Sequence, residues 1–90
     1  MAKYLIEAPH ESSPQACLRA LDAFLQAGAH FLTNAEWGCM DGDHRAWIII
    51  DADSEAEARM VIPPVLRHSA HVVKLTKFTP EKIRELKGNV

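Results

Sequence analysis

Apolar and polar residues follow two different periods along this chain, and the changes of period predict its elements. Residues 3–8 are mostly apolar and stop at Pro9, which predicts a first strand. Alternation over 30–37 and apolar runs over 45–51 and 71–78 predict three more strands. Because successive side chains of a strand point to opposite faces, the same pattern assigns each residue to one face of a sheet.

Residues typical of helix starts and ends lie between the expected strands and after the last one. Ser13 precedes a proline, as is typical of a helix start, and apolar residues then recur at helical spacing until Gly28. A capping box at 54–57 predicts a second helix, which must end before the two prolines at 63–64. The Thr-Pro-Glu sequence at 79–81 predicts a last short helix over 80–87.

The resulting order, strand, helix, strand, strand, helix, strand and a final helix, predicts a ferredoxin-like α+β fold. We expect one domain over residues 1–90, with an antiparallel sheet in the order 4-1-3-2 and two helices on one face. The third strand is apolar on both sides, so the uncovered face would expose Trp47 and Ile49. Since such a patch is too large to leave in water, we expect a homodimer that stacks two sheets.

Composition narrows the class of protein further. The chain has 90 residues, of which 48% are hydrophobic and 24% charged, with a net charge of −2, as in an ordinary globular domain. The mixed charges give no basic face for nucleic acid, and no apolar run is long enough for a membrane span. Without a leader-like N-terminus, the expected location is the cytoplasm, where Cys17 and Cys39 are reduced. A disulfide between these two cysteines stays open as an alternative.

Residues 37–44, between the second and third strands, carry more chemistry than a turn requires. A turn uses Gly and Asp, but it does not need a thiol or an imidazole. In the 4-1-3-2 topology this hairpin lies at the same edge as the end of the first strand and the start of the fourth. The residues expected at that edge are His10, Cys17, Cys39, Asp41, Asp43, His44, His68 and His71.

Three interpretations of this edge stay open. The leading one is a small binding protein in which His10, Cys39 and His44 hold a transition metal ion such as Ni, Zn or Cu. Asp43 is then a further ligand or a group that orients one. The second is acid–base or nucleophilic chemistry by a histidine or Cys39. The third is structural, because Asp-Gly-Asp turns and buried cysteines are common without function.

A second candidate site lies on the face expected between two stacked sheets. Glu7, on a central strand, is expected there with Asn34, Trp47 and Lys74, and Lys74 is the expected partner of its carboxylate. A mixed polar and apolar pocket at these residues suits a small aromatic or carbonyl compound. This gives the alternative function, a cofactor-free monooxygenase or isomerase. A structural or regulatory dimer without chemistry is a further alternative.

Four segments of the chain carry a resemblance to a known family. They are Tyr-Leu-Ile-Glu-Ala-Pro-His at 4–10, Cys-Leu-Arg-Ala-Leu-Asp at 17–22, residues 37–44, and Lys-Phe-Thr-Pro-Glu-Lys-Ile at 77–83. The chain resembles small bacterial proteins of the dimeric α+β barrel superfamily, which have no assigned activity. The resemblance implies the fold and the dimer. The superfamily also includes cofactor-free monooxygenases and small nickel-binding proteins, but no site residue carries over from them.

Overall fold

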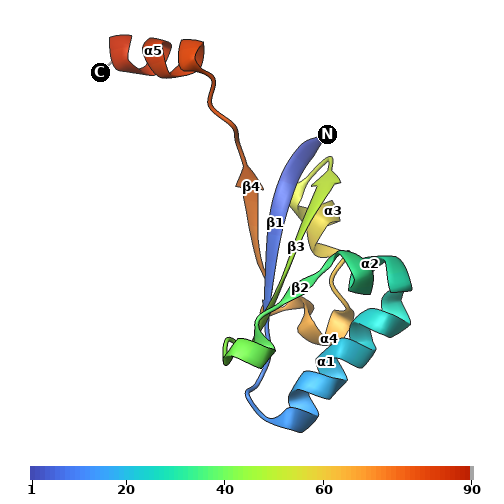
Figure 1. Cartoon of the computed structure of the whole chain (residues 1–90). Helices are drawn as coiled ribbons and strands as arrows, with labels where there is room; N and C mark the ends of the chain where they lie inside the picture. The colour runs from blue at the N-terminus through green and yellow to red at the C-terminus, as the bar shows by residue number, and fades with distance from the viewer. Residues whose placement is uncertain (90) are drawn as a thin grey trace.

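Four antiparallel strands and several helices make up the computed structural model, which describes residues 1–89 (Figure 1). The strands lie in the spatial order β2-β3-β1-β4, and every neighbouring pair is antiparallel. The mixed α+β class expected from the sequence is therefore confirmed. The strands are β1 (Ala2–Pro9), β2 (Glu36–Trp37), β3 (Arg45–Ala52) and β4 (His71–Leu75). The helices are α1 (Pro14–Ala27), α2 (Ala29–Asn34), α3 (Glu55–Arg59), α4 (Pro64–Arg67) and α5 (Pro80–Gly88), with a 3-10 turn, η1, at Cys39–Asp41.

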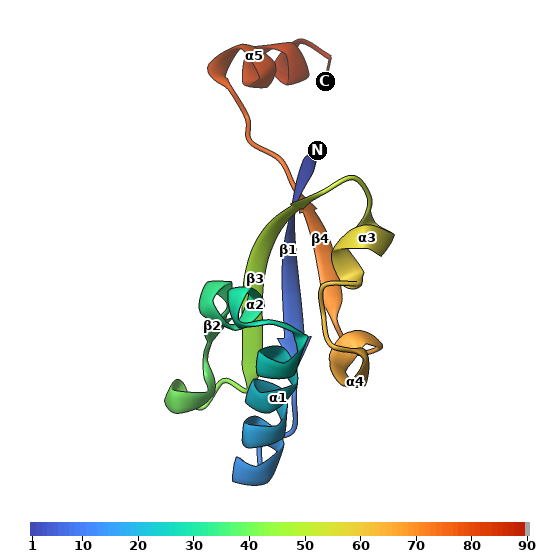
Figure 2. The same ribbon diagram turned by 90° about the vertical axis from the view of Figure 1, so that its right-hand side faces the viewer.

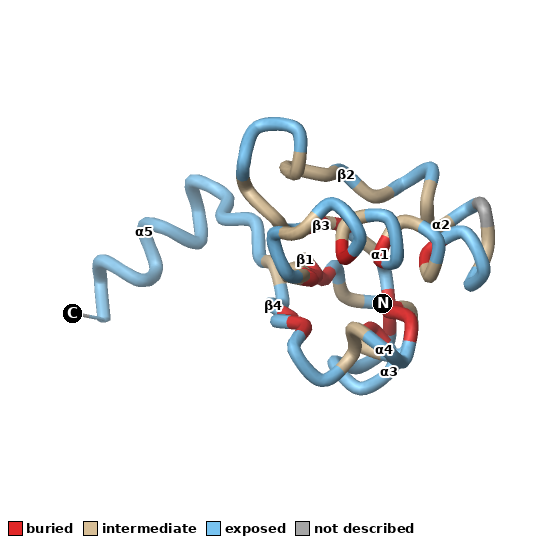
Figure 3. The backbone as a smooth tube through the Cα atoms, turned by 90° about the horizontal axis from the view of Figure 1, so that it is seen from below, coloured by how far each residue is buried: buried red, intermediate tan, exposed pale blue. Residues whose placement is uncertain are grey.

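Helices α1 to α4 all lie to the right of the sheet in Figure 1, and in Figure 2 this covered side faces the viewer. Among residues 1–89 no helix packs on the other face of the sheet, which is left bare. Burial along strand β1 alternates accordingly. Tyr4, Ile6 and Ala8 point to the covered face and are buried, while the residues between them are not. Phe24 of α1 is fully buried against the same face. Seen along the strands, the buried positions gather between the sheet and these helices (Figure 3).

The helix starts confirm the capping signals of the sequence. The Ser13 hydroxyl accepts a hydrogen bond from the backbone N–H of Ala16 at 3.1 Å, which caps α1. Ser54 caps α3 in the same way, and Thr79 caps α5. Each cap supplies an acceptor for one of the N–H groups that a helix leaves unpaired at its first turn.

The strand expected over 30–37 is wrong. Residues 29–34 form helix α2, and only Glu36–Trp37 pair with β3. Gly28, with φ 144°, separates α1 from α2, and the Asn34 side chain donates to the carbonyl of His30 at 2.7 Å. Phe31, Leu32 and Ala35 all pack against the core, and this i, i+1, i+4 spacing is that of a helix, because successive strand residues would point to opposite faces.

The expected extent and facing of the fourth strand also need correction. Strand β4 ends at Leu75 instead of residue 78. Lys74 pairs with Tyr4, whose side chain is under the helices, so Lys74 does not share the bare face. Val73 pairs with Leu5 and stands on the bare face in its place. The sequence assigned the residues of β4 to the wrong faces of the sheet. Successive positions of β4 are apolar, so the pattern does not show which of them point to the core.

Helix α5 lies away from the rest of the molecule (Figure 1). All its residues are exposed, and the long axis of the protein reaches 52 Å. No helix formed by residues 1–89 has both the length and the apolar character needed to cross a membrane.

Truncation of the core at Phe24 tests this packing. Phe24→Ala is expected to lower the free energy of unfolding by about 3–5 kcal/mol, since it leaves a cavity under the sheet. Urea denaturation followed by circular dichroism measures the change. The matched control is Leu25→Ala, because Leu25 is 50% exposed on the same helix and should cost about 1 kcal/mol or less. Equal losses for both variants would contradict the assigned core.

Candidate functional site

The pairing of β1 with β3 brings His10 and His44 side by side. The ladder runs to Pro9 opposite Arg45, and the N–H of His10 then donates to the carbonyl of His44 at 3.0 Å. Opposite residues of an antiparallel pair point to the same face. Both imidazoles therefore lie on the helix-covered face, as Ala8 does, and their ring centroids are 5.6 Å apart in an edge-to-face arrangement.

The hairpin turn between β2 and β3 positions Cys39. The Gly38 carbonyl accepts from the N–H groups of Asp41 (2.9 Å) and Asp43 (3.0 Å), and the Cys39 carbonyl accepts from the N–H of Gly42. Gly42 closes the turn with φ 84°, a conformation that suits glycine. These bonds fold residues 38–43 back on themselves, so that Cys39 approaches the two histidines.

Three metal-binding side chains converge here. One donor atom from each of His10, Cys39 and His44 lies within 4.8 Å of the other two. Nε2 of His10 lies 3.2 Å from Sγ of Cys39, within hydrogen-bond distance. All three side chains are half-buried. The structure thus brings together three of the four metal ligands expected from the sequence.

Aromatic packing holds the His10 ring in place. Trp37 lies edge-on to Phe24, with ring centroids 5.1 Å apart, and its centroid is 6.0 Å from that of His10. The Nδ1 atoms of His10 and His44 are both buried without a hydrogen-bond partner among residues 1–89. A buried imidazole nitrogen without a partner carries a desolvation cost.

Burial shifts the pKa values of His10 and Cys39 toward their neutral forms. Burial first, and then the neighbouring His44, lower the pKa of His10. Burial and then the adjacent Cys17 thiol raise the pKa of Cys39 to about 11. A thiol with this pKa is protonated at neutral pH and is a poor nucleophile, which argues against the nucleophilic interpretation of Cys39. Both cysteines are free, so no disulfide joins Cys17 to Cys39.

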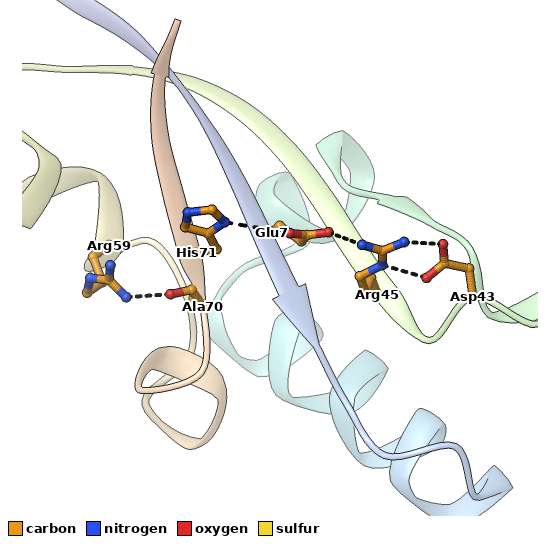
Figure 4. A network of polar contacts seen from close by, with 6 residues as sticks. All are labelled: Glu7, Asp43, Arg45, Arg59, Ala70 and His71. Carbon is orange, nitrogen blue, oxygen red and sulfur yellow. Dashed lines mark hydrogen bonds and ion pairs between the residues drawn. The ribbon is translucent and has the colours of Figure 1, made fainter.

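Asp43 does not join this group. Its two carboxylate oxygens accept from the Arg45 guanidinium at 2.6 and 2.5 Å, and that hydrogen bonding lowers the pKa of Asp43. Arg45 also pairs with Glu7 at 2.5 Å and lies over the Trp47 ring, 5.2 Å from its centroid. Figure 4 shows the row that results, from His71 through Glu7 and Arg45 to Asp43. The carboxylate expected at the metal is thus engaged on the opposite face.

The four residues expected in a pocket between sheets do not converge within one chain. Glu7 and Trp47 are cross-strand neighbours on the bare face. Asn34 belongs to α2, where it contacts His30, and Lys74 faces the other way. The ion pair expected between Glu7 and Lys74 is replaced by that between Glu7 and Arg45.

The remaining members of the expected cluster lie outside the group of three donors. Asp41 is exposed in η1, His68 lines a cavity that His10 also lines, and His71 lies 3.8 Å from Glu7 on the bare face. The sequence did not indicate the role of Arg45, which forms ion pairs with the carboxylates of both Glu7 and Asp43. Its position opposite Pro9, two residues along from Glu7, was available from the strand register alone.

Comparison with known proteins gives no further guide to this site. No family model matches the chain, and neither curated proteins nor solved structures contain a significant match.

The turn has a steric requirement that a substitution can test. A Cβ at Gly38 would lie 2.6 Å from the carbonyl oxygen of Asp43 and 2.9 Å from the Trp47 ring. Gly38→Ala is therefore expected to destabilise the protein by about 1–3 kcal/mol, measured by urea denaturation. Gly42→Asn is the control, since a Cβ there meets nothing and Asn tolerates left-handed backbone. A Gly38→Ala protein as stable as Gly42→Asn would contradict the close approach.

Proposed function

We propose that this protein binds a divalent transition metal ion through Nε2 of His10, Sγ of Cys39 and one ring nitrogen of His44. The observation that carries the proposal is the convergence of three such donors within 4.8 Å. In a tetrahedral site with bonds of about 2.0–2.3 Å, two donors lie about 3.5 Å apart. The spacing of 3.2 Å between His10 and Cys39 is close to this value.

The donor set favours zinc, nickel or copper over magnesium or calcium. A thiolate and two imidazoles are soft or borderline ligands, whereas the hard cations select carboxylate and carbonyl oxygens. Asp43, the carboxylate next to His44 in sequence, is already bound by Arg45. Binding requires that the metal displace the thiol proton of Cys39.

Three protein ligands leave one position of a tetrahedral ion open. Closed structural zinc sites use four protein ligands, while sites that exchange a ligand keep a free position. Cys17 is adjacent to Cys39, but it is outside the group of three donors. We therefore propose a site that holds an exchangeable fourth ligand.

Metal titration of the untagged protein tests the site. Zn²⁺, Ni²⁺ and Cu²⁺ should each bind one per chain, and Cys39→Ser, His10→Gln and His44→Gln should each weaken zinc by at least about 100-fold. Removing a residue that only supports a ligand costs about 10-fold to 100-fold in metal affinity, so removing a ligand itself should cost at least as much. Competition with a chromophoric chelator gives the affinities. With Co²⁺ as a probe, the near-ultraviolet thiolate-to-metal absorption should vanish in Cys39→Ser alone.

Two variants serve as controls for this titration. His30→Gln removes an exposed imidazole on α2, and Cys17→Ser removes the thiol beside the site. Both should keep zinc affinity within a few-fold of the wild-type value. A chain that neither co-purifies with zinc, nickel or copper nor binds them on titration would contradict the proposal.

We also propose that the fold is ferredoxin-like and that two copies stack their bare sheet faces as a dimeric α+β barrel, in a reducing, cytoplasmic setting. The support is an apolar band across three strands, in which Leu5 is flanked by Ile49 and Val73. Ile49 is 54% exposed in the single chain. A continuous uncovered band of this kind marks an interface.

Ile49→Asp tests the dimer, because it places a charge in the middle of this band. Sedimentation velocity should show a wild-type dimer and an Ile49→Asp monomer. Leu18→Asp is the matched control, since Leu18 is 66% exposed on the helix-covered side and its variant should stay dimeric. A wild-type chain that sediments as a monomer would overturn the proposal.

A further inference from the structure

A cavity of about 490 Å³ opens beside the metal-binding group, between the end of β1, helix α1 and helix α4. These three elements gather at the end of the sheet away from both termini (Figure 1). Its volume is in the range of small-molecule pockets. His10 belongs both to the wall of this cavity and to the group of metal-binding side chains.

The wall of the cavity is mainly apolar and carries one arginine. Its apolar lining includes Ala16 and Ala20 of α1, Leu66 of α4 and Pro9 at the end of β1. Arg19, one turn along α1 from Ala16, supplies the positive charge. Such a combination suits a ligand with an apolar body and one anionic group.

Arg19 differs from the other arginines in having no partner. Within residues 1–89, every other arginine donates to a carbonyl or pairs with a carboxylate, while Arg19 does neither. The pairs are Arg45 with Glu7 and Asp43, Arg59 with Ala70, Arg67 with Ile62, and Arg84 with Glu81. A guanidinium without a partner beside an apolar cavity can donate two parallel hydrogen bonds to the carboxylate of a ligand.

The charge of the cavity limits the anion. Glu11 lies in the same lining, so a ligand with two negative charges would meet a repelling carboxylate. We propose that the cavity between α1 and α4 binds a small apolar monocarboxylate, with the carboxylate on Arg19 and the apolar body against Ala16, Ala20 and Leu66. This goes beyond the metal site and does not depend on it.

A titration with 3-phenylpropionate, monitored by amide NMR on protein freed of metal by a chelator, tests the inference. Saturable shifts are expected in residues 9–20 and 65–69. The neutral isostere 3-phenylpropanamide should bind at least about tenfold more weakly, because it loses the charge-assisted bonds to Arg19. Inorganic phosphate should not displace the carboxylate.

Variants complete the test. Arg19→Met should weaken 3-phenylpropionate at least about tenfold. Arg84→Met, which removes an exposed arginine on α5, should leave its affinity unchanged. Glu11→Gln should tighten it by about twofold to fivefold, the usual range for one exposed charge pair.

Several results would overturn the inference. They are equal affinity for the acid and the amide, shifts confined to other residues, displacement by phosphate, or weaker binding to Glu11→Gln. The carboxylate titration uses metal-free protein, so its failure would not contradict the proposed metal site. Failure of the metal titration would likewise not contradict carboxylate binding in the cavity.

Discussion

The antiparallel pairing of β1 with β3 is the constraint on which the rest of the structure depends. Eight residue pairs, from Ala2 opposite Ala52 to Pro9 opposite Arg45, set the register of the two central strands. A shift of one residue would exchange the faces of every side chain on one strand. It would expose Ile6 and separate the two imidazoles of His10 and His44. The register therefore fixes the core and the candidate site together.

This register also separates two kinds of chemistry at one end of the sheet. On the helix-covered face lie two imidazoles and a thiol, and burial raises the pKa of that thiol. On the bare face lies a row of charges in which Arg45 joins Glu7 to Asp43 (Figure 4). Asp43 and His44 are neighbours in sequence, yet their side chains point to opposite faces of the sheet, because successive side chains alternate along extended backbone. The arginine thus holds the Asp43 carboxylate away from the three candidate ligands.

Local signals determined most of the elements. Side-chain caps and prolines set the starts of α1, α3 and α5, because a hydroxyl and a fixed φ act within one turn of the chain. The segment 29–34 was assigned wrongly, because six residues are too few for a helical period to be told from alternation. The facing of Lys74 was wrong too, since consecutive apolar residues in β4 do not define a face.

By itself, the sequence determined the α+β class and the edge at which His10, Cys39 and His44 would meet. Only the tertiary structure decided which side chains converge there. It removed Asp43, because Arg45 binds that carboxylate. It placed His71 beside Glu7 on the bare face and His68 in the lining of the cavity that His10 shares. It also placed the unpaired Arg19 beside an apolar cavity. These outcomes depend on strand register and on contacts between distant segments, which residue spacing along the chain does not encode.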